Sequence, residues 1–258
     1  MKVVILAGGM GTRISEESQY KPKPMIEIGG KPIIWHIMKY YSSYGFNEFI
    51  ICCGYKGDMI KKYFLEYNAR ISNVKFDLKS DNYELLSSNV EPWKVTLVNT
   101  GLKTLTSGRL LKIKEYIDED EFLFTYGDGV SNVELDKLIK FHKSNGKIAT
   151  ITVTKPEGRF GTVKIDKNTK EILSFKEKAR ADQSLVNIGY GIFSKKIFKY
   201  LGDGSDMLEG LPFDNLVKDN QMNAYEHNGF WSPMDTMKDK KYLEKIWKAT
   251  SVPWKRWL

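Results

Sequence analysis

The chain begins with a short apolar segment that runs directly into a glycine-rich turn. Residues 3–6, Val-Val-Ile-Leu, are followed by Ala-Gly-Gly-Met-Gly-Thr-Arg and then, at residues 21–24, by Lys-Pro-Lys-Pro. Because glycine has no Cβ, such a turn brings exposed backbone N–H groups close to a ligand. A nest of N–H groups beside Arg13 and Lys23 suits a polyphosphate. We therefore expect the first strand and its turn to bind a nucleotide.

Strand-like and helix-like segments then alternate through the first half of the chain. Apolar spacing predicts strands over residues 3–6, 49–53, 95–99, 122–126 and 149–153. It predicts helices over residues 33–44, 58–67, 108–116 and 132–144. This order is typical of a largely parallel sheet covered by helices on both faces.

The pattern changes after residue 153. We expect a hairpin over residues 160–165 and 172–176, a strand over 185–193 and a helix over 234–248. The predicted fold is therefore α/β and Rossmann-like, with three layers around a mostly parallel sheet and a smaller mixed or antiparallel part.

Composition excludes several classes of protein. No apolar run approaches the roughly 20 residues of a membrane span, and the first apolar run stops at glycines, unlike a signal peptide. We therefore expect a cytoplasmic protein with no membrane partner. The net charge of +8 comes from lysines spread along the chain, which indicates a solvated surface and no nucleic-acid partner. The adjacent Cys52 and Cys53 point to opposite faces of a predicted strand, so we expect core residues rather than a disulfide.

Two familiar nucleotide motifs do not match the opening turn. The Rossmann fingerprint Gly-x-Gly-x-x-Gly, counted from Gly9, would need a glycine where Ile14 stands. A Walker A loop would need Gly-Lys-Ser/Thr after four residues, and neither Gly8 nor Gly9 has that continuation. An ordinary glycine turn beside surface lysines stays open as the plainer alternative.

Two aspartates are candidate metal ligands. Asp128 lies between two glycines directly after a buried strand, at the sheet edge where open α/β sheets bind ligands. Asp235 precedes the predicted C-terminal helix and would supply a second carboxylate for Mg²⁺. Either side chain could instead cap a helix. The three histidines, at positions 36, 142 and 227, have no metal-binding spacing, and we expect them to be structural or exposed.

The segment 6–13, Leu-Ala-Gly-Gly-Met-Gly-Thr-Arg, together with Lys-Pro-Lys-Pro, resembles the signature of the sugar-1-phosphate nucleotidylyltransferases. Other segments resemble the branch of that family that transfers a cytidylyl group to glucose 1-phosphate. They are Trp-His-Ile-Met-Lys at 35–39, residues 49–57, Glu-Pro-Trp at 91–93, Phe-Thr-Tyr-Gly-Asp-Gly-Val at 124–130, Gly-Arg-Phe-Gly at 158–161, Trp-Ser-Pro-Met-Asp-Thr at 231–236 and the tail 252–257. The resemblance spans essentially the whole chain.

The resemblance implies a reaction and its partners. CTP and a sugar 1-phosphate, α-D-glucose 1-phosphate in that branch, would give CDP-glucose and pyrophosphate with Mg²⁺ as cofactor. The product serves the synthesis of deoxysugars for bacterial surface polysaccharide, and members of the family form homo-oligomers, typically hexamers. The implied fold is that of the nucleotide-diphospho-sugar transferases. Residues 1–258 would form one domain, with a nucleotide-binding half over about 1–130, a sugar-binding half over about 131–235, and a C-terminal helix and tail over about 236–258.

The resemblance also implies roles for particular residues. Nucleotide contacts fall on Leu6, Ala7, Gly8, Gly9, Gly11, Thr12, Arg13, Lys23, Thr106, Gly108 and Arg109. Sugar-phosphate contacts fall on Gly161, Glu177, Lys178 and Asn187. The expected catalytic residues are Arg13, Lys23 and Asp128, and the expected metal ligands are Asp128 and Asp235.

The sequence departs from the family pattern mainly where the sugar should bind. Ala179 replaces a proline, Ser107 replaces a glycine, and Ile188 replaces a glycine whose position could face the sugar. Another sugar phosphate, another nucleotide, or a non-catalytic nucleotide-binding role are therefore alternatives. The C-terminal tryptophans could bury apolar surface against a neighbouring subunit or within their own.

Overall fold

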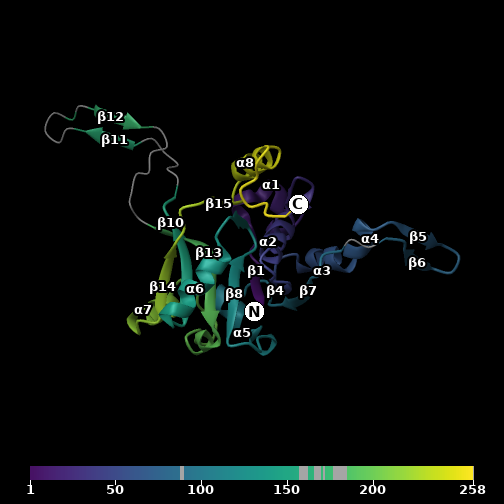
Figure 1. The fold of residues 1–258 in the computed structure, drawn as a ribbon, viewed down its shortest axis with the longest axis horizontal. Coiled ribbons are helices and arrows are strands. Elements are labelled where there is room, and N and C mark those ends of the chain that lie inside the picture. Colours follow the sequence, from purple (N-terminus) through teal and green to yellow (C-terminus); the bar gives the residue numbers. More distant parts are fainter. Residues whose placement is uncertain (88–89, 157–161, 166–169, 171, 177–184, 258) are drawn as a thin grey trace.

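The computed structural model describes residues 1–87, 90–156, 162–165, 170, 172–176 and 185–257. Its centre is a seven-stranded sheet in the order β14-β10-β13-β8-β1-β4-β7 (Figure 1). The strands are β1 (Val3–Ala7), β4 (Glu48–Cys53), β7 (Lys94–Asn99), β8 (Glu121–Tyr126), β10 (Ala149–Thr154), β13 (Val186–Ser194) and β14 (Met222–Glu226). β13 runs antiparallel to both of its neighbours, and the other pairings are parallel. The predicted mostly parallel α/β sheet is therefore confirmed.

Helices cover both faces of this sheet. Buried side chains of α2 (Ile33–Ser42), α3 (Gly57–Leu65), α6 (Leu135–Asn145) and α8 (Met237–Trp247) join one apolar cluster. Those of α5 (Thr106–Leu111) and α7 (Leu211–Lys218) join the other. Alternate residues of β1 enter opposite clusters, as Ile5 and Leu6 do, because successive strand side chains point to opposite faces. Cys52 and Cys53 are likewise split between the two clusters, which confirms them as core residues.

Short elements complete the described chain. The helices are α1 (Ser15–Ser18) and α4 (Tyr67–Ile71), with 3₁₀ turns η1 (Thr12–Ile14), η2 (Lys23–Met25), η3 (Lys114–Tyr116) and η4 (Lys195–Lys199). The paired short strands are β2 (Glu27–Ile28) with β3 (Lys31–Pro32) and β9 (Gly129–Ser131) with β15 (Trp231–Pro233).

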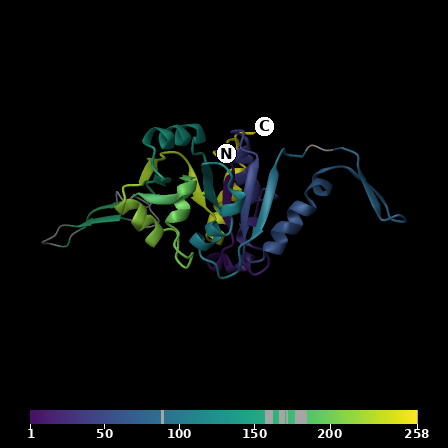
Figure 2. The same cartoon turned by 90° about the horizontal axis from the view of Figure 1, so that it is seen from below.

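Two hairpins extend away from the sheet on opposite sides of the molecule (Figures 1 and 2). One pairs β11 (Thr162–Ile165) with β12 (Ile172–Lys176), which confirms two predicted strands whose turn falls outside the described residues. The other pairs β5 (Val74–Asp77) with β6 (Asn82–Leu85), and the sequence did not indicate it. Its aromatic side chains Phe76 and Tyr83 are exposed.

The predicted helix over residues 108–116 is divided in the structure. α5 ends at Leu111, and a separate 3₁₀ turn follows over Lys114–Tyr116. The apolar side chains on both sides of this break, Leu110 and Ile113, still enter the same core cluster. Apolar spacing therefore continued across the break and could not reveal it.

The C-terminal tryptophans pack within their own subunit. Trp254 is fully buried and stacks on Phe230, with ring centroids 5.5 Å apart, and on Trp247 at 6.2 Å. Trp257 meets the edge of Trp35 at 5.6 Å. The interpretation that these rings cover a neighbouring subunit was wrong for Trp254, because helix α8 and the tail fold back onto α2 and occupy that apolar surface themselves.

His36 is buried beneath this tail in its neutral form. Its Nε2 donates to the Ile28 carbonyl at 2.8 Å, and its Nδ1 accepts from Trp254 Nε1 at 3.4 Å. Burial disfavours the imidazolium and lowers the pKa of His36 to about 4.

This shift predicts acid sensitivity. The unfolded chain takes up a proton at His36 near pH 6.5 and the folded chain only near pH 4, so stability falls as the pH drops between these values. We expect His36 to contribute roughly 3 kcal/mol of that loss. Urea unfolding at several pH values should show a shallower decline for His36→Gln than for the wild type. An unchanged slope in the variant would contradict this origin.

None of the helices in the described part of the chain has the length and apolar character that crossing a bilayer requires.

Candidate active site

The candidate site lies at the carboxyl ends of β1 and β8. These strands are parallel neighbours, and the Gly127 N–H donates to the Leu6 carbonyl at 2.9 Å where they end. From β1 the chain builds the sheet outward through β4 and β7, and then returns to add β8 on the other side. The loops after β1 and β8 therefore diverge, which opens a crevice of the kind that binds ligands in α/β sheets.

The glycine-rich turn forms one wall of a small pocket. Gly11 has φ of 66°, a left-handed conformation that favours glycine, and Ser18 Oγ donates to its carbonyl at 2.9 Å. The pocket has a volume of about 180 Å³. Predicted residues that line it are Leu6, Ala7, Gly9, Gly11, Thr12, Arg13, Lys23 and Asp128. Gly8 is buried behind this wall.

Two cations and two carboxylates meet at the edge of this pocket. Lys23 Nζ lies 2.8 Å from Asp128 Oδ2 and also contacts Asp235 Oδ1. Arg13 Nη1 lies 2.7 Å from Asp235 Oδ2. The Lys23 side chain is only 8% exposed, and burial alone would lower its pKa. The neighbouring carboxylates outweigh burial, so the pKa of Lys23 is raised and its ammonium stays charged.

The pairing of β9 with β15 brings the two aspartates together. The Met234 N–H donates to the Asp128 carbonyl at 2.7 Å, which places Asp235 beside Asp128 although 107 residues separate them. Neither carboxylate caps a helix. The cap of α8 is Thr236, in a capping box with Asp239, and α6 follows Glu134. The helix-cap alternative is therefore wrong for both aspartates.

The donor chemistry of this pair fits Mg²⁺. Carboxylate oxygens are its preferred protein ligands, and Mg²⁺ commonly takes one or two of them with phosphate oxygens and water. Within the described ranges no group of three or more His, Cys, Asp or Glu side chains could hold a metal ion. Asp128 and Asp235 would thus hold Mg²⁺ only together with a bound phosphate.

A second pocket of about 400 Å³ adjoins the first and shares Arg13 and Asp128 with it. Predicted Asn187 lines this pocket, and its Oδ1 accepts from the Gly189 N–H at 2.9 Å. Ile188 also borders it, but its side chain is 4% exposed and belongs to the core cluster. The bulk of Ile188 therefore fills the core rather than the pocket.

Sequence reasoning missed Glu209. This carboxylate lines the larger pocket, where the Tyr126 hydroxyl hydrogen bonds to it. Thr106 Oγ1 accepts from the Leu208 N–H at 2.6 Å, and this hydrogen bond holds the loop that carries Glu209 against the start of α5. The loop has no motif of its own, and only the packing against α5 brings it to the site.

The remaining predicted contacts divide into two groups. Gly108 packs its Cα against Gly204, and the Arg109 guanidinium is buried against backbone carbonyls. Neither residue lines the two pockets. Gly161, Glu177 and Lys178 lie outside the described residues.

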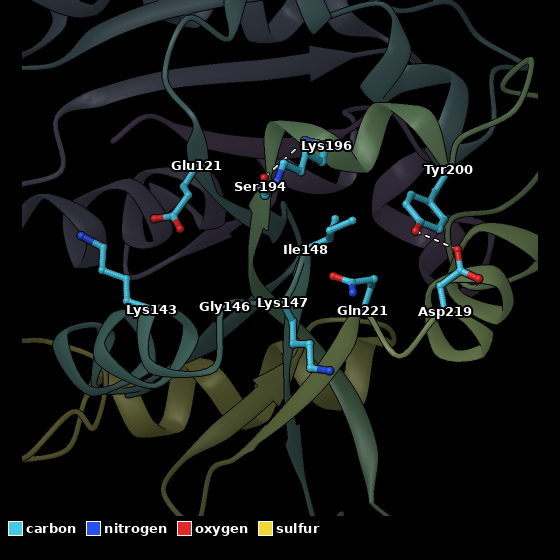
Figure 3. Close-up of a pocket in the computed structure, with 10 residues that line it drawn as sticks. All are labelled: Glu121, Lys143, Gly146, Lys147, Ile148, Ser194, Lys196, Tyr200, Asp219 and Gln221. Atoms are coloured by element: carbon cyan, nitrogen blue, oxygen red, sulfur yellow. Dashed lines mark hydrogen bonds between the residues drawn. The ribbon is translucent and has the colours of Figure 1, made fainter.

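A larger hollow of about 620 Å³ lies at the opposite end of the sheet (Figure 3). Its wall carries charges of both signs, including Lys143, Lys147 and Glu121, and Tyr200 donates to Asp219 there at 2.8 Å. None of the predicted site residues in the described part of the chain borders it. The described predicted residues that line a pocket therefore do so at the two smaller pockets.

Comparison with known proteins identifies the family of this chain. The family model described as nucleotidyl transferase matches residues 2–246. The chain belongs to the nucleotidyl transferase family. It is 48% identical over 258 residues to a glucose-1-phosphate cytidylyltransferase of Salmonella typhimurium, with both chains covered completely. It is 28% identical to a mannose-1-phosphate guanylyltransferase catalytic subunit beta of Xenopus tropicalis, over 93% of this chain and 62% of that protein.

Solved structures show the same fold. HddC from Yersinia pseudotuberculosis, solved alone and with GMP-PN, matches with a TM-score of 0.70 and 25% identity, over 96% of this chain and 99% of that one. A UDP-glucose pyrophosphorylase in complex with UDP-glucose matches with a TM-score of 0.66 and 17% identity, over 95% and 97% of the two chains. This nucleotidyltransferase therefore shares with its structural neighbours a fold of three layers, with a central sheet between two layers of helices.

Proposed function

We propose that this nucleotidyltransferase transfers the cytidylyl group of CTP to α-D-glucose 1-phosphate, giving CDP-glucose and pyrophosphate. The observation that carries the proposal is the pair of adjoining pockets that share Arg13 and Asp128. One pocket, walled by the glycine-rich turn, suits the phosphates of the nucleotide. The other is lined by both polar and apolar residues and is large enough for a sugar phosphate. The full-length similarity to the Salmonella typhimurium protein supports the choice of CTP and glucose 1-phosphate.

The chemistry needs no protein nucleophile. An oxygen of the sugar phosphate attacks the α-phosphorus of CTP in line, and the bond from that phosphorus to the bridging oxygen of pyrophosphate breaks. Because the attacking group is already an anion, catalysis consists of positioning the reactants and stabilising charge. Lys23 and Arg13 would neutralise the phosphates as they enter. Mg²⁺ held by Asp128 and Asp235 would supply further charge stabilisation and orient the phosphate oxygens.

Lys23 must change partners for this to occur. In the structure its ammonium joins both aspartates, and Mg²⁺ would compete with it for the same oxygens. We propose that the released ammonium then pairs with the α-phosphate. The Arg13 side chain is 70% accessible, and its guanidinium would exchange its ion pair with Asp235 for the phosphates of the leaving group.

A substrate panel tests the proposal. CTP, UTP, GTP and dTTP are each combined with glucose, mannose and galactose 1-phosphates and Mg²⁺, and pyrophosphate release is measured. We expect the highest kcat/KM for CTP with glucose 1-phosphate. A higher value for another pair would reassign the substrates. Tight CTP binding with no release across the panel would favour a non-catalytic nucleotide-binding protein.

We also propose that the chain acts in the cytoplasm as a single-domain homo-oligomer, a hexamer by resemblance. Support for assembly comes from hairpin β5–β6, which extends away from the sheet (Figure 2). The side chains of Phe76, Leu78 and Tyr83 on this hairpin are exposed. Isolated two-stranded hairpins are marginally stable in water, so such a surface gains from a partner. Sedimentation equilibrium measures the assembly directly, and a monomer at micromolar concentration would contradict it.

A further inference from the structure

Arg109 hydrogen bonds to two loops at the carboxyl edge of the sheet and lies against a third. Its Nη2 donates to the Gly8 carbonyl at 3.0 Å, in the loop after β1. Its Nη1 donates to Thr100 Oγ1 at 2.6 Å and to the Gly101 carbonyl at 2.9 Å, in the loop after β7. The Tyr55 N–H, from the loop after β4, reaches the same Gly8 carbonyl at 3.2 Å. With 5% exposure, the guanidinium is committed to these protein acceptors.

Two glycines leave the space that this guanidinium occupies. A Cβ built on Gly8 would overlap the Arg109 guanidinium. A Cβ built on Gly54 would lie 2.5 Å from Arg109 Nη1 and 2.6 Å from the Gly8 carbonyl oxygen. Neither glycine has a positive φ. Both positions are therefore glycine because the Arg109 guanidinium packs close to them, and not because of their backbone conformation.

The neighbouring Gly9 differs from Gly8. It is exposed and lines the small pocket, and a Cβ there would meet no atom within 4 Å. The peptide that joins the two residues is trans and planar, so the Gly8 carbonyl and the Gly9 N–H point in opposite directions. Holding that carbonyl on Arg109 therefore directs the Gly9 N–H away from the guanidinium.

We propose that Arg109 is a positioning residue that fixes the Gly8–Gly9 peptide so that the Gly9 N–H meets a nucleotide phosphate, and that Gly8 is glycine to admit Arg109. The inference rests on the proposed function for the identity of the ligand. The two adjacent glycines of the turn then have different roles. Gly8 leaves room for the Arg109 side chain, and Gly9 presents its N–H to the nucleotide. A donor fixed in advance binds a phosphate without the cost of ordering the loop.

The test is a cycle of single and double substitutions at Gly8 and Arg109. Arg109→Ala should fold, because the Gly8 carbonyl keeps the Tyr55 N–H and Thr100 Oγ1 keeps the Cys53 carbonyl at 2.7 Å. We expect Arg109→Ala and Gly8→Ala each to lower kcat/KM for CTP by about 10- to 100-fold, as misplacing a binding group does. In the Arg109→Ala background, adding Gly8→Ala should lower kcat/KM for CTP by less than about threefold further.

Guanidinium ion supplies a second readout. Millimolar guanidinium chloride should restore activity to Arg109→Ala, because the ion can enter the vacated space. It should not restore the double variant, where the methyl group added by Gly8→Ala would fill part of that space. General stabilisation of the fold would not produce this difference. Gly9→Ala is the matched control, and its methyl faces only the ligand, so its effect should be equal with and without Arg109.

Two results would overturn the inference. One is a loss of kcat/KM from Gly8→Ala that is as large in the absence of Arg109 as in its presence, because Gly8 would then act on the ligand directly. The other is equal guanidinium rescue of the single and double variants. The same coupling should appear in thermal unfolding midpoints, which need no substrate. A wild-type chain that is inactive with CTP would thus contradict the proposed function while leaving this inference testable.

Discussion

Asp128→Asn is expected to lower turnover at least ~100-fold, as loss of a metal clamp does, while the protein stays folded. The substitution keeps the shape of the side chain and removes the charge that Asp128 offers to Lys23 and, in the proposed mechanism, would offer to Mg²⁺. Lys23 retains Asp235, so no buried ammonium is left alone. Steady-state kinetics with CTP, glucose 1-phosphate and Mg²⁺ measure the loss, and circular dichroism checks the fold.

The matched control is Asp219→Asn. Asp219 is an exposed carboxylate at the far hollow, where it accepts from Tyr200. Its removal should leave turnover within about twofold of the wild type, since surface changes away from a site have small effects. Near-wild-type turnover in Asp128→Asn would refute the metal-ligand assignment. A second readout is Mn²⁺ binding in the presence of CTP, which should weaken in Asp128→Asn and not in the control.

Trp254→Ala is expected to lower the free energy of unfolding by about 3–5 kcal/mol, the usual loss for truncating a buried tryptophan. The ring is fully buried and contacts Phe230, Trp247 and His36 within one subunit. Its removal leaves a cavity between α2 and the tail. Urea unfolding measures the change, at a protein concentration varied tenfold to separate folding from assembly.

Trp254→Phe refines this prediction. It keeps most of the apolar contacts and loses the N–H that donates to His36 Nδ1, so we expect a loss of about 1–2 kcal/mol. Tyr20→Ala is the surface control, because the Tyr20 side chain is exposed. If Trp254→Ala left unfolding unchanged and lowered only the mass of the assembly, the ring would belong to a subunit interface, and the packing described above would be wrong.

Several residues that converge on the site could be predicted from their motifs, two of which, the glycine-rich turn and the Asp128 loop, follow strands of the central sheet. Lys23 and Asp128 each belong to a recognisable sequence motif, and the structure places Lys23 Nζ 2.8 Å from Asp128 Oδ2. Asp235 was harder, since a carboxylate before a helix usually suggests a cap. The structure shows that Thr236 takes that role, and the pairing of β9 with β15 brings Asp235 to Asp128.

Other features depend on contacts between distant segments. Arg109 stands beside a glycine in the sequence, as an anion-binding arginine would, and nothing local reveals that it is buried against the Gly8 carbonyl. Glu209 belongs to a loop without a motif. The helix α7 escaped prediction because it is short and two of its apolar side chains, Leu211 and Val217, are exposed. The hairpin β5–β6 escaped because its strands have few apolar residues, most of them exposed.

The measurement that tests the central claim most directly is ³¹P NMR of the purified chain with Mg²⁺, CTP and α-D-glucose 1-phosphate. If the two pockets join these substrates, CDP-glucose and pyrophosphate should appear in equal amounts as both substrates decline, and omission of the sugar phosphate should stop pyrophosphate formation. Inorganic phosphate as the product, or pyrophosphate and CMP without a sugar nucleotide, would contradict nucleotidyl transfer at this site.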